Sequence, residues 1–159
     1  MKKIDKKYRG QRNNNPLNIV VSKSKWVGKV TDPLLKKDSK FEEFTEMKYG
    51  IRAAIKLLMN YIKQSTDTVP AIIRRWCPDE TAETYIGIVM KQLQKWFPDF
   101  HKRKTITCHD FEVLMRLVQA MAIVESQYKI DDNEFLEAWL EVHPNNLFNN
   151  KQRQAKREE

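Results

Sequence analysis

The chain has few of the residues on which several common functional sites depend. Only 4 of its 159 residues are glycine and only 2 are cysteine. Four scattered glycines exclude the glycine-rich loop with which many nucleotide-binding proteins hold phosphates. Cys77 and Cys108 alone do not define a disulfide framework. Cys108, His101 and His109 lack the spacing of a zinc finger, and no fourth ligand is evident. We therefore expect no metal site and no cofactor.

Long apolar runs are absent as well. No stretch approaches the roughly 18 uninterrupted apolar residues of a membrane helix, so we expect no membrane span. Residues 1–15 carry the positive charge of the start of a signal peptide, but no apolar segment follows them. We therefore expect synthesis in the cytoplasm without a signal peptide, and any export by another route.

Charge is abundant, and the positive sign prevails. Lys and Arg number 29 against 21 Asp and Glu, which gives a net charge of +8. This excess predicts an anionic partner: nucleic acid, a membrane surface or the bacterial cell wall. The length suffices for one domain with a core. We expect a monomer whose single domain spans residues 1–143, with a mobile basic arm at 1–8 and a disordered polar tail at 144–159.

The hydrophobic pattern predicts a mainly α fold with a small β component (α+β). Residues 18–21, 25–30 and 41–45 look like short strands, and they predict one small antiparallel sheet near the N-terminus. From Gly50 onward the apolar residues recur at helical spacing. The sheet should therefore precede a helical body.

Helix signals divide the rest of the chain. We expect helices at residues 50–63, 68–76, 81–97 and 108–128, and a short one after Asp131 or Asp132. Thr68 and Thr81 are placed to cap two of them, because threonine is a good N-cap residue. The last helix is expected to turn four apolar side chains inward: Phe135, Leu136, Trp139 and Leu140.

The helix at 108–128 ends in a carboxylate that continues its apolar face. Leu114, Val118 and Met121 recur at offsets of four and seven, and Glu125 follows eleven residues after Leu114, close to three full turns. A carboxylate there is partly desolvated, which raises its pKa and makes it a candidate general acid. The alternative is that the helix frays at Ser126 and that Glu125 turns into water.

A cluster of amides lies near the other end of the chain. Residues 13–19 read NNNPLNI, and asparagine with proline favours turns, because the short amides bond to nearby backbone. One interpretation is an ordinary loop. The other is a set of amide donors and acceptors that line a polar ligand such as a sugar.

Several short motifs follow one another in a recognisable order. They are RGQRNNNPLNI at residues 9–19, WVG at 26–28, DSKFEEF at 38–44, GIRA at 50–53, TVPAIIRRW at 68–76 and TAETYIGIV at 81–89. With these motifs, residues 9–89 resemble a family of phage and prophage virion-associated lytic proteins. The remainder resembles it more loosely.

That family looks like the lysozyme and lytic transglycosylase superfamily. AIVES at residues 122–126 is similar to the AIxxxESG motif that ends the catalytic helix of soluble lytic transglycosylases, with a shorter spacing and Gln127 in place of the glycine. Thr81, Tyr85 and Val89 are similar to the tyrosine-bearing helix near that glutamate. In those enzymes the glutamate comes first, whereas here it comes last. The resemblance therefore implies a circularly permuted lysozyme-like domain.

The resemblance implies an enzyme that cleaves the MurNAc–GlcNAc glycan of peptidoglycan, possesses no cofactor and acts on the cell wall from a virion. Glu125 is the expected acid and base, and Asp38 is the best second carboxylate, with Glu42 and Glu43 as alternatives and a plain turn role for Asp38 equally open. One carboxylate suffices for a lytic transglycosylase, since a hydroxyl of the substrate attacks, whereas a muramidase needs two. The expected substrate-binding residues are Asn13, Asn15, Asn18, Trp26, Tyr85 and Ser126.

Two interpretations outside enzymology compete. A small basic helical module could bind nucleic acid, which the net charge of +8 favours equally. The positive residues are scattered over loops and tails, however, and do not gather on one helix face. A virion structural protein that keeps the fold without activity is the third interpretation. Tyr85 as a core residue would suit either.

Overall fold

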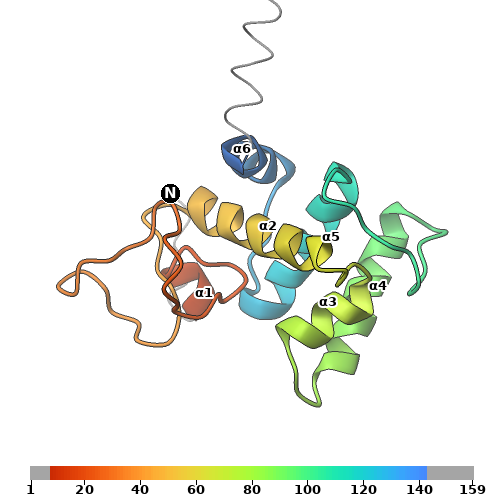
Figure 1. Cartoon of the computed structure of the whole chain (residues 1–159), viewed down its shortest axis with the longest axis horizontal. Helices are drawn as coiled ribbons and strands as arrows, with labels where there is room; N and C mark the ends of the chain where they lie inside the picture. Colours follow the sequence, from red (N-terminus) through yellow and green to blue (C-terminus); the bar gives the residue numbers. More distant parts are fainter. Residues whose placement is uncertain (1–7, 143–159) are drawn as a thin grey trace, which may run out of the picture.

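The computed structural model of the chain describes residues 8–142, which contain six helices (Figure 1). They are α1 (Arg9–Arg12), α2 (Met47–Lys63), α3 (Val69–Trp76), α4 (Ala82–Trp96), α5 (Phe111–Ser126) and α6 (Asp132–Val142). The predicted basic arm and polar tail lie outside the described residues, apart from Tyr8 at the end of the arm. The mainly helical prediction is confirmed.

α5 is the helix around which the others gather. α1, α2 and α4 all contact it, while α6 packs on α2 and α3 packs on α4. The side chains of Leu114, Val118 and Met121 are at most 1% exposed, so the predicted apolar stripe of α5 is the core face. Burying such side chains stabilises the fold by roughly 1.5–3 kcal/mol each. The end of α5, where Glu125 lies, is therefore anchored in the core.

The predicted sheet near the N-terminus is wrong. In the described residues the segment before α2 contains two isolated antiparallel bridges, Val20 with Phe41 and Lys29 with Phe44, and no strand. Side-chain amides bond to the backbone of this segment: Asn15 donates to two backbone carbonyl oxygens, and Asn14 donates to the carbonyl of Phe44. Asparagine side chains compete with regular backbone pairing in this way. The alternating pattern therefore belongs to a half-buried, extended loop.

The helix boundaries agree closely with the sequence signals. The Thr68 hydroxyl accepts the N–H of Ala71 as a true cap, whereas the Thr81 side chain makes no capping bond. Asp131 caps α6, since its carboxylate accepts the N–H of Glu134 and the Glu134 carboxylate accepts the N–H of Asp131. This reciprocal pair is a capping box.

The inward direction predicted for two residues of α6 is wrong. Leu136 and Leu140 are 43% and 40% exposed, whereas Phe135 is fully buried. Phe135 and Trp139 meet Phe111 of α5, with ring centroids 5.5 and 5.2 Å away. Leu136 and Leu140 are each one residue further along, about 100° around the helix, and so face away from this aromatic cluster.

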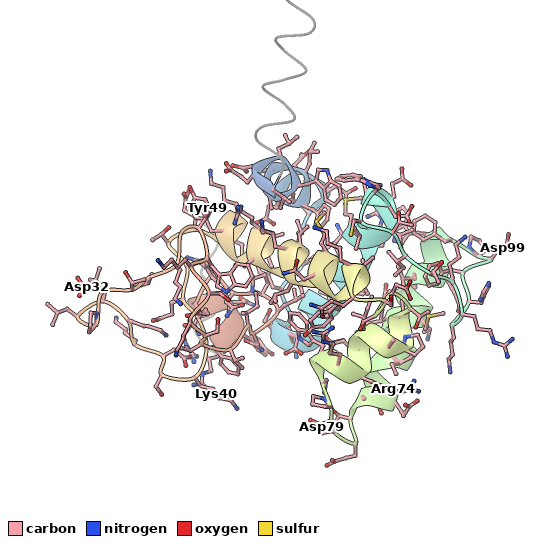
Figure 2. The ribbon with its side chains drawn as sticks, in the orientation of Figure 1. Asp32, Lys40, Tyr49, Arg74, Asp79 and Asp99 are labelled. Atoms are coloured by element: carbon pink, nitrogen blue, oxygen red, sulfur yellow. The ribbon has the colours of Figure 1, made fainter. Side chains whose placement is uncertain are left out.

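Among the described residues, no helix combines the length and apolar character needed to cross a membrane. The helices form the body of the molecule, and the loop between α1 and α2 extends to one side of it (Figures 1 and 2).

Candidate active site at the end of α5

The asparagine cluster folds into a turn at residues 13–18, named here the asparagine turn. Asn14 and Asn18 have left-handed backbone, with φ of 51° and 53°. Asparagine adopts this conformation more readily than most residues. Asn15 is fully buried, donates to two carbonyl oxygens at 2.9 and 3.0 Å, and accepts the N–H of Ile19. The amides thus build the turn itself.

Two glycines let helices approach this turn closely. A Cβ at Gly10 of α1 would lie 2.6 Å from the Cβ of Ser126, and a Cβ at Gly50 of α2 would overlap the carbonyl oxygen of Asn14. Ser126 is buried and donates its hydroxyl to the carbonyl of Pro16 at 2.8 Å. The asparagine turn is therefore clamped against α1, α2 and the end of α5.

Glu125 lies one residue before the end of α5 with a half-buried side chain. The Asn18 amide donates to its backbone carbonyl at 3.0 Å and to its Oε2 at 3.2 Å, across a sequence separation of 107 residues. The asparagine turn therefore lies beside Glu125. The helix continues to Ser126, so the alternative of a frayed end is wrong.

The surroundings of Glu125 favour its neutral form. Burial raises the pKa of its carboxyl group above the ordinary value, and interactions with the side chains of Asn18, Tyr85 and Trp76 offset part of that rise. Burial also raises the pKa of the Tyr85 phenol, and the neighbouring Glu125 adds to the effect. Tyr85 comes from α4 and Trp76 from the end of α3. Four separate segments thus meet at one carboxyl group.

Two buried polar atoms beside this carboxyl group lack a hydrogen-bond partner among the described residues. They are Oδ1 of Asn18 and the hydroxyl of Tyr85. The Tyr85 hydroxyl is close enough to Glu125 to interact with its charge, yet it completes no well-formed hydrogen bond. Buried polar atoms are normally paired, so the unpaired hydroxyl of Tyr85 is an unusual feature of the surroundings of this acid. The Oδ1 of Asn18 lies against Gly10 of α1.

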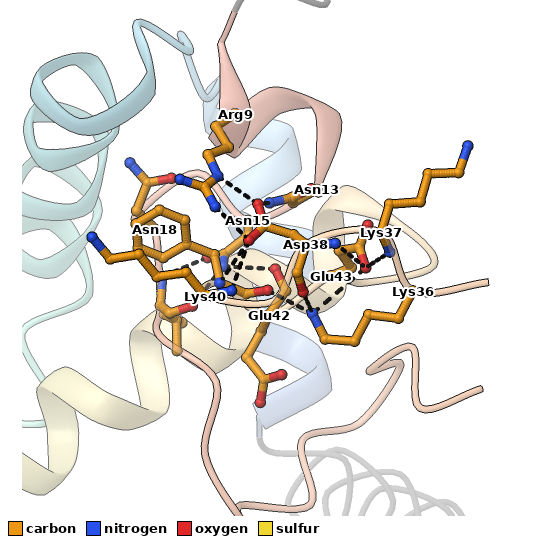
Figure 3. A network of polar contacts seen from close by, with 12 residues as sticks. Arg9, Asn13, Asn15, Asn18, Lys36, Lys37, Asp38, Lys40, Glu42 and Glu43 are labelled. Atoms are coloured by element: carbon orange, nitrogen blue, oxygen red, sulfur yellow. Dashed lines mark hydrogen bonds and ion pairs between the residues drawn. The ribbon is translucent and has the colours of Figure 1, made fainter. Parts of the chain in front are cut away.

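Asp38, the predicted second carboxylate, is the centre of a polar network (Figure 3). The Arg9 guanidinium donates to both of its oxygens, at 2.6 and 2.8 Å, and Asn13 donates to Oδ2 at 2.9 Å. The backbone N–H groups of Lys40 and Phe41 also donate to it. The bond from Arg9 holds the pKa of Asp38 well below its usual range. Asp38 is therefore negatively charged at neutral pH, and it links α1 to the loop between α1 and α2.

The alternative carboxylates are engaged elsewhere in the same loop. Glu42 is fully buried, and its Oε2 lies 2.8 Å from the Lys29 ammonium, an ion pair without the geometry of a directed hydrogen bond. The close contact of opposite charges compensates the buried anion. Glu43 accepts the backbone N–H of Lys37 at 2.8 Å and lies 3.6 Å from the Lys36 ammonium. Each carboxylate thus has a partner that stabilises the loop.

The remaining predicted substrate-binding residues divide into two groups. The polar groups of Asn13, Asn15 and Ser126 described above bond within the fold. Trp26 packs against the core, and its buried Nε1 has no hydrogen-bond partner in the described part of the chain. Trp76 was not predicted as a site residue. It belongs to the RRW motif, but nothing in the spacing of that motif indicates that it faces Glu125.

Two hollows occur on other parts of the surface. One of about 760 Å³ lies between α4, α5 and residues 129–132, and one of about 460 Å³ lies between the end of α2 and residues 106–109. Glu125 lines neither of them. Within residues 8–142, no group of three or more His, Cys, Asp or Glu side chains could hold a metal ion.

Comparison with known proteins finds sequence similarity to a phage protein. No protein-family model matches it. Over 92 residues it is 39% identical to Protein P5 of Pseudoalteromonas phage PM2, a match that covers 54% of this chain and 56% of that protein. The chain is related to a phage protein. It spans about half the length of this relative, whose name states no activity.

Proposed function

We propose that the chain is a peptidoglycan-degrading glycosidase that cleaves the glycan strand in the manner of a lytic transglycosylase. The arrangement around Glu125 carries the proposal. A half-buried carboxyl group with a raised pKa lies beside the unpaired polar atoms of Asn18 and Tyr85. A general acid needs such an environment, because it must hold its proton near neutral pH.

The chemistry requires one side chain in two successive roles. The Glu125 carboxyl group gives its proton to the glycosidic oxygen while the bond to the sugar carbon breaks. The resulting carboxylate then takes the proton of the substrate hydroxyl that attacks this carbon, which restores the acid. The Asn18 amide would orient the acid, because it donates to Oε2 of Glu125, and the Tyr85 hydroxyl would hold a sugar hydroxyl, because it has no partner among the described residues.

The state of Asp38 supports the single-carboxylate form of the reaction over a muramidase. A second catalytic carboxylate must face the substrate or its attacking water. Asp38 instead accepts hydrogen bonds from Arg9, Asn13 and two backbone N–H groups. The similarity to a phage protein supports delivery to the cell wall by a virion.

Digestion of purified peptidoglycan by the wild type and by Glu125→Gln tests the proposal. Glutamine keeps the shape and removes the transferable proton, so the rate should fall by about 10²–10⁴-fold. Glu112→Gln is the matched control, since Glu112 is exposed in the first turn of the same helix. Mass analysis of the products should show ring-closed sugar ends, each one water lighter than a hydrolytic product.

Unimpaired digestion by Glu125→Gln would exclude Glu125 as the acid, and products carrying the extra water would favour the muramidase. Stability offers a second readout. Because the folded state raises the pKa of Glu125, its charged form destabilises the fold above the ordinary pKa of about 4.3. Glu125→Gln should therefore be as stable as the wild type or slightly more stable at pH 7. This difference should vanish below about pH 4, where the carboxyl group is protonated in both states.

A further inference from the structure

The loop that extends from the helical body combines exposed apolar and basic side chains. We name residues 20–40 the basic lobe. Five large hydrophobic residues there are exposed: Val20, Val21, Val27, Leu34 and Leu35. Leu34 is 92% exposed and Leu35 is 66% exposed, more than any other large hydrophobic residue of the described chain. Two adjacent leucines this exposed to water call for an explanation, because most such side chains are buried on folding.

The leucines are held outward by a turn that Asp32 builds. The Asp32 carboxylate accepts the N–H of Leu34 at 2.9 Å, and its carbonyl accepts the N–H groups of Leu35 and Lys36 at 3.0 and 2.9 Å. Figure 2 shows Asp32 at the outer end of the lobe, far from the helices. These bonds fix the backbone of the turn, and both side chains face water there.

The surroundings of the leucines are strongly basic. The lobe contains six lysines and two aspartates, a net charge of +4 and half of the +8 of the whole chain. Lys29 and Lys36 are paired with Glu42 and Glu43, and Asp38 is paired with Arg9. The other four lysines, Lys23, Lys25, Lys37 and Lys40, are exposed. The positive charge is thus directed to solvent on the same lobe as the leucines.

We propose that the basic lobe docks on the surface of an anionic lipid bilayer. Leu34 and Leu35 insert among the acyl chains at the headgroup boundary, and the lysines meet the phosphate groups. Apolar insertion and attraction to anionic lipid together are the usual basis of such binding. A polar glycan offers no apolar phase for leucine, so the substrate of the proposed reaction does not explain this surface. Such docking would hold the protein beside a membrane, independently of the catalytic residues.

Sedimentation with lipid vesicles tests this proposal. The full chain should bind vesicles of phosphatidylcholine with added phosphatidylglycerol. The double variant Leu34→Ser with Leu35→Ser should bind at least about tenfold more weakly, because both apolar side chains lose their place in the acyl layer. The matched control is Leu136→Ser with Leu140→Ser, which removes two half-exposed leucines from α6. The control should bind like the wild type.

The charge component is tested separately. Lys23→Gln with Lys25→Gln should weaken binding, whereas Lys102→Gln with Lys104→Gln, the same charge change in an exposed loop after α4, should have little effect. Binding should be absent on pure phosphatidylcholine and should decline toward about 1 M salt, where charges are screened beyond about 3 Å.

Failure of the wild type to bind anionic vesicles overturns the proposal and assigns the leucines to a protein partner. Equal binding by the Leu34 and Leu35 variant, or equal binding to neutral lipid, also overturns it. Digestion of purified peptidoglycan should be the same for the leucine variant and the wild type, so failure of the lipid proposal is distinguishable from failure of the proposed enzymatic activity.

Discussion

The two carboxylates predicted as catalytic residues, Glu125 and Asp38, have opposite environments. Glu125 is half-buried among neutral side chains, and burial raises its pKa. Asp38 is bonded to a guanidinium and to backbone N–H groups, which lower its pKa. The first environment suits a group that transfers a proton, and the second suits a fixed anion that orders a loop.

Asp38→Asn should destabilise the protein at neutral pH by about 1–2 kcal/mol, because it removes charge-assisted bonds whose Arg9 partner is partly solvated. The folded state lowers the pKa of Asp38, so its contribution is complete above the ordinary value of about 3.9 and is lost as pH falls through the folded value. Urea unfolding at pH 7 and near pH 3 measures this. The difference between variant and wild type should shrink at the lower pH.

Asp99→Asn is the control for that measurement, since Asp99 is exposed and lies outside the network. It should change stability by less than about 0.5 kcal/mol at both pH values. An Asp38→Asn protein as stable as the wild type at pH 7 contradicts a structural role for the Arg9–Asp38 pair.

At the scale of the element, the end of α5 depends on an unusual backbone conformation. Gln127 follows the helix with φ 49° and ψ 31°, in the left-handed region. Its N–H bonds to the carbonyl of Ile123, and the N–H of Tyr128 bonds to that of Ala122. Helices commonly end in this way, usually with glycine at the left-handed position. The AIxxxESG motif of lytic transglycosylases, to which residues 122–126 are similar, has glycine at this position.

Gln127→Gly should therefore stabilise the protein by about 0.5–1 kcal/mol, because it removes the steric cost of left-handed backbone at a side-chain-bearing residue. The control is Gln64→Gly after α2, where φ is −95° and glycine only adds freedom to the unfolded chain. The free energy of unfolding of Gln64→Gly should be lower than that of the wild type. Denaturant unfolding of both variants measures the contrast, and destabilisation of Gln127→Gly would exclude a strained cap.

At the scale of the whole molecule, α6 joins the C-terminal end of the described chain to α2 and α5. It packs on α2, where Lys48 lies 3.5 Å from Glu137 and 3.7 Å from Glu141. Exposed ion pairs of this kind contribute little. The stronger connection is Phe135, which is fully buried against Phe111 of α5.

Phe135→Ala should cost about 3–5 kcal/mol through lost apolar burial and the cavity left behind. If the helices fold as one unit, circular dichroism and tryptophan fluorescence should report the same lowered transition. Leu136→Ala, a neighbouring half-exposed leucine, should cost far less. Separate transitions for the two probes in Phe135→Ala would show that α6 unfolds independently.

Local patterns in the sequence determined the helical body. Apolar spacing located α5 and its buried face, Thr68 located the start of α3, and the pair Asp131 and Asp132 located that of α6. Such features depend on residues within one or two turns of each other, so a linear pattern contains them. The position of Glu125 on the apolar face of α5 is determined in the same way.

Only the tertiary structure decided how the region before α2 folds and what surrounds Glu125. The alternating pattern of residues 18–45 is compatible with a sheet, yet only two isolated bridges form, and amides of the asparagine turn bond to three backbone carbonyl groups of the same segment. Likewise, no spacing connects Trp76 or Asn18 to Glu125. These contacts join segments far apart in the chain, and their geometry depends on how α1, α3, α4 and α5 pack.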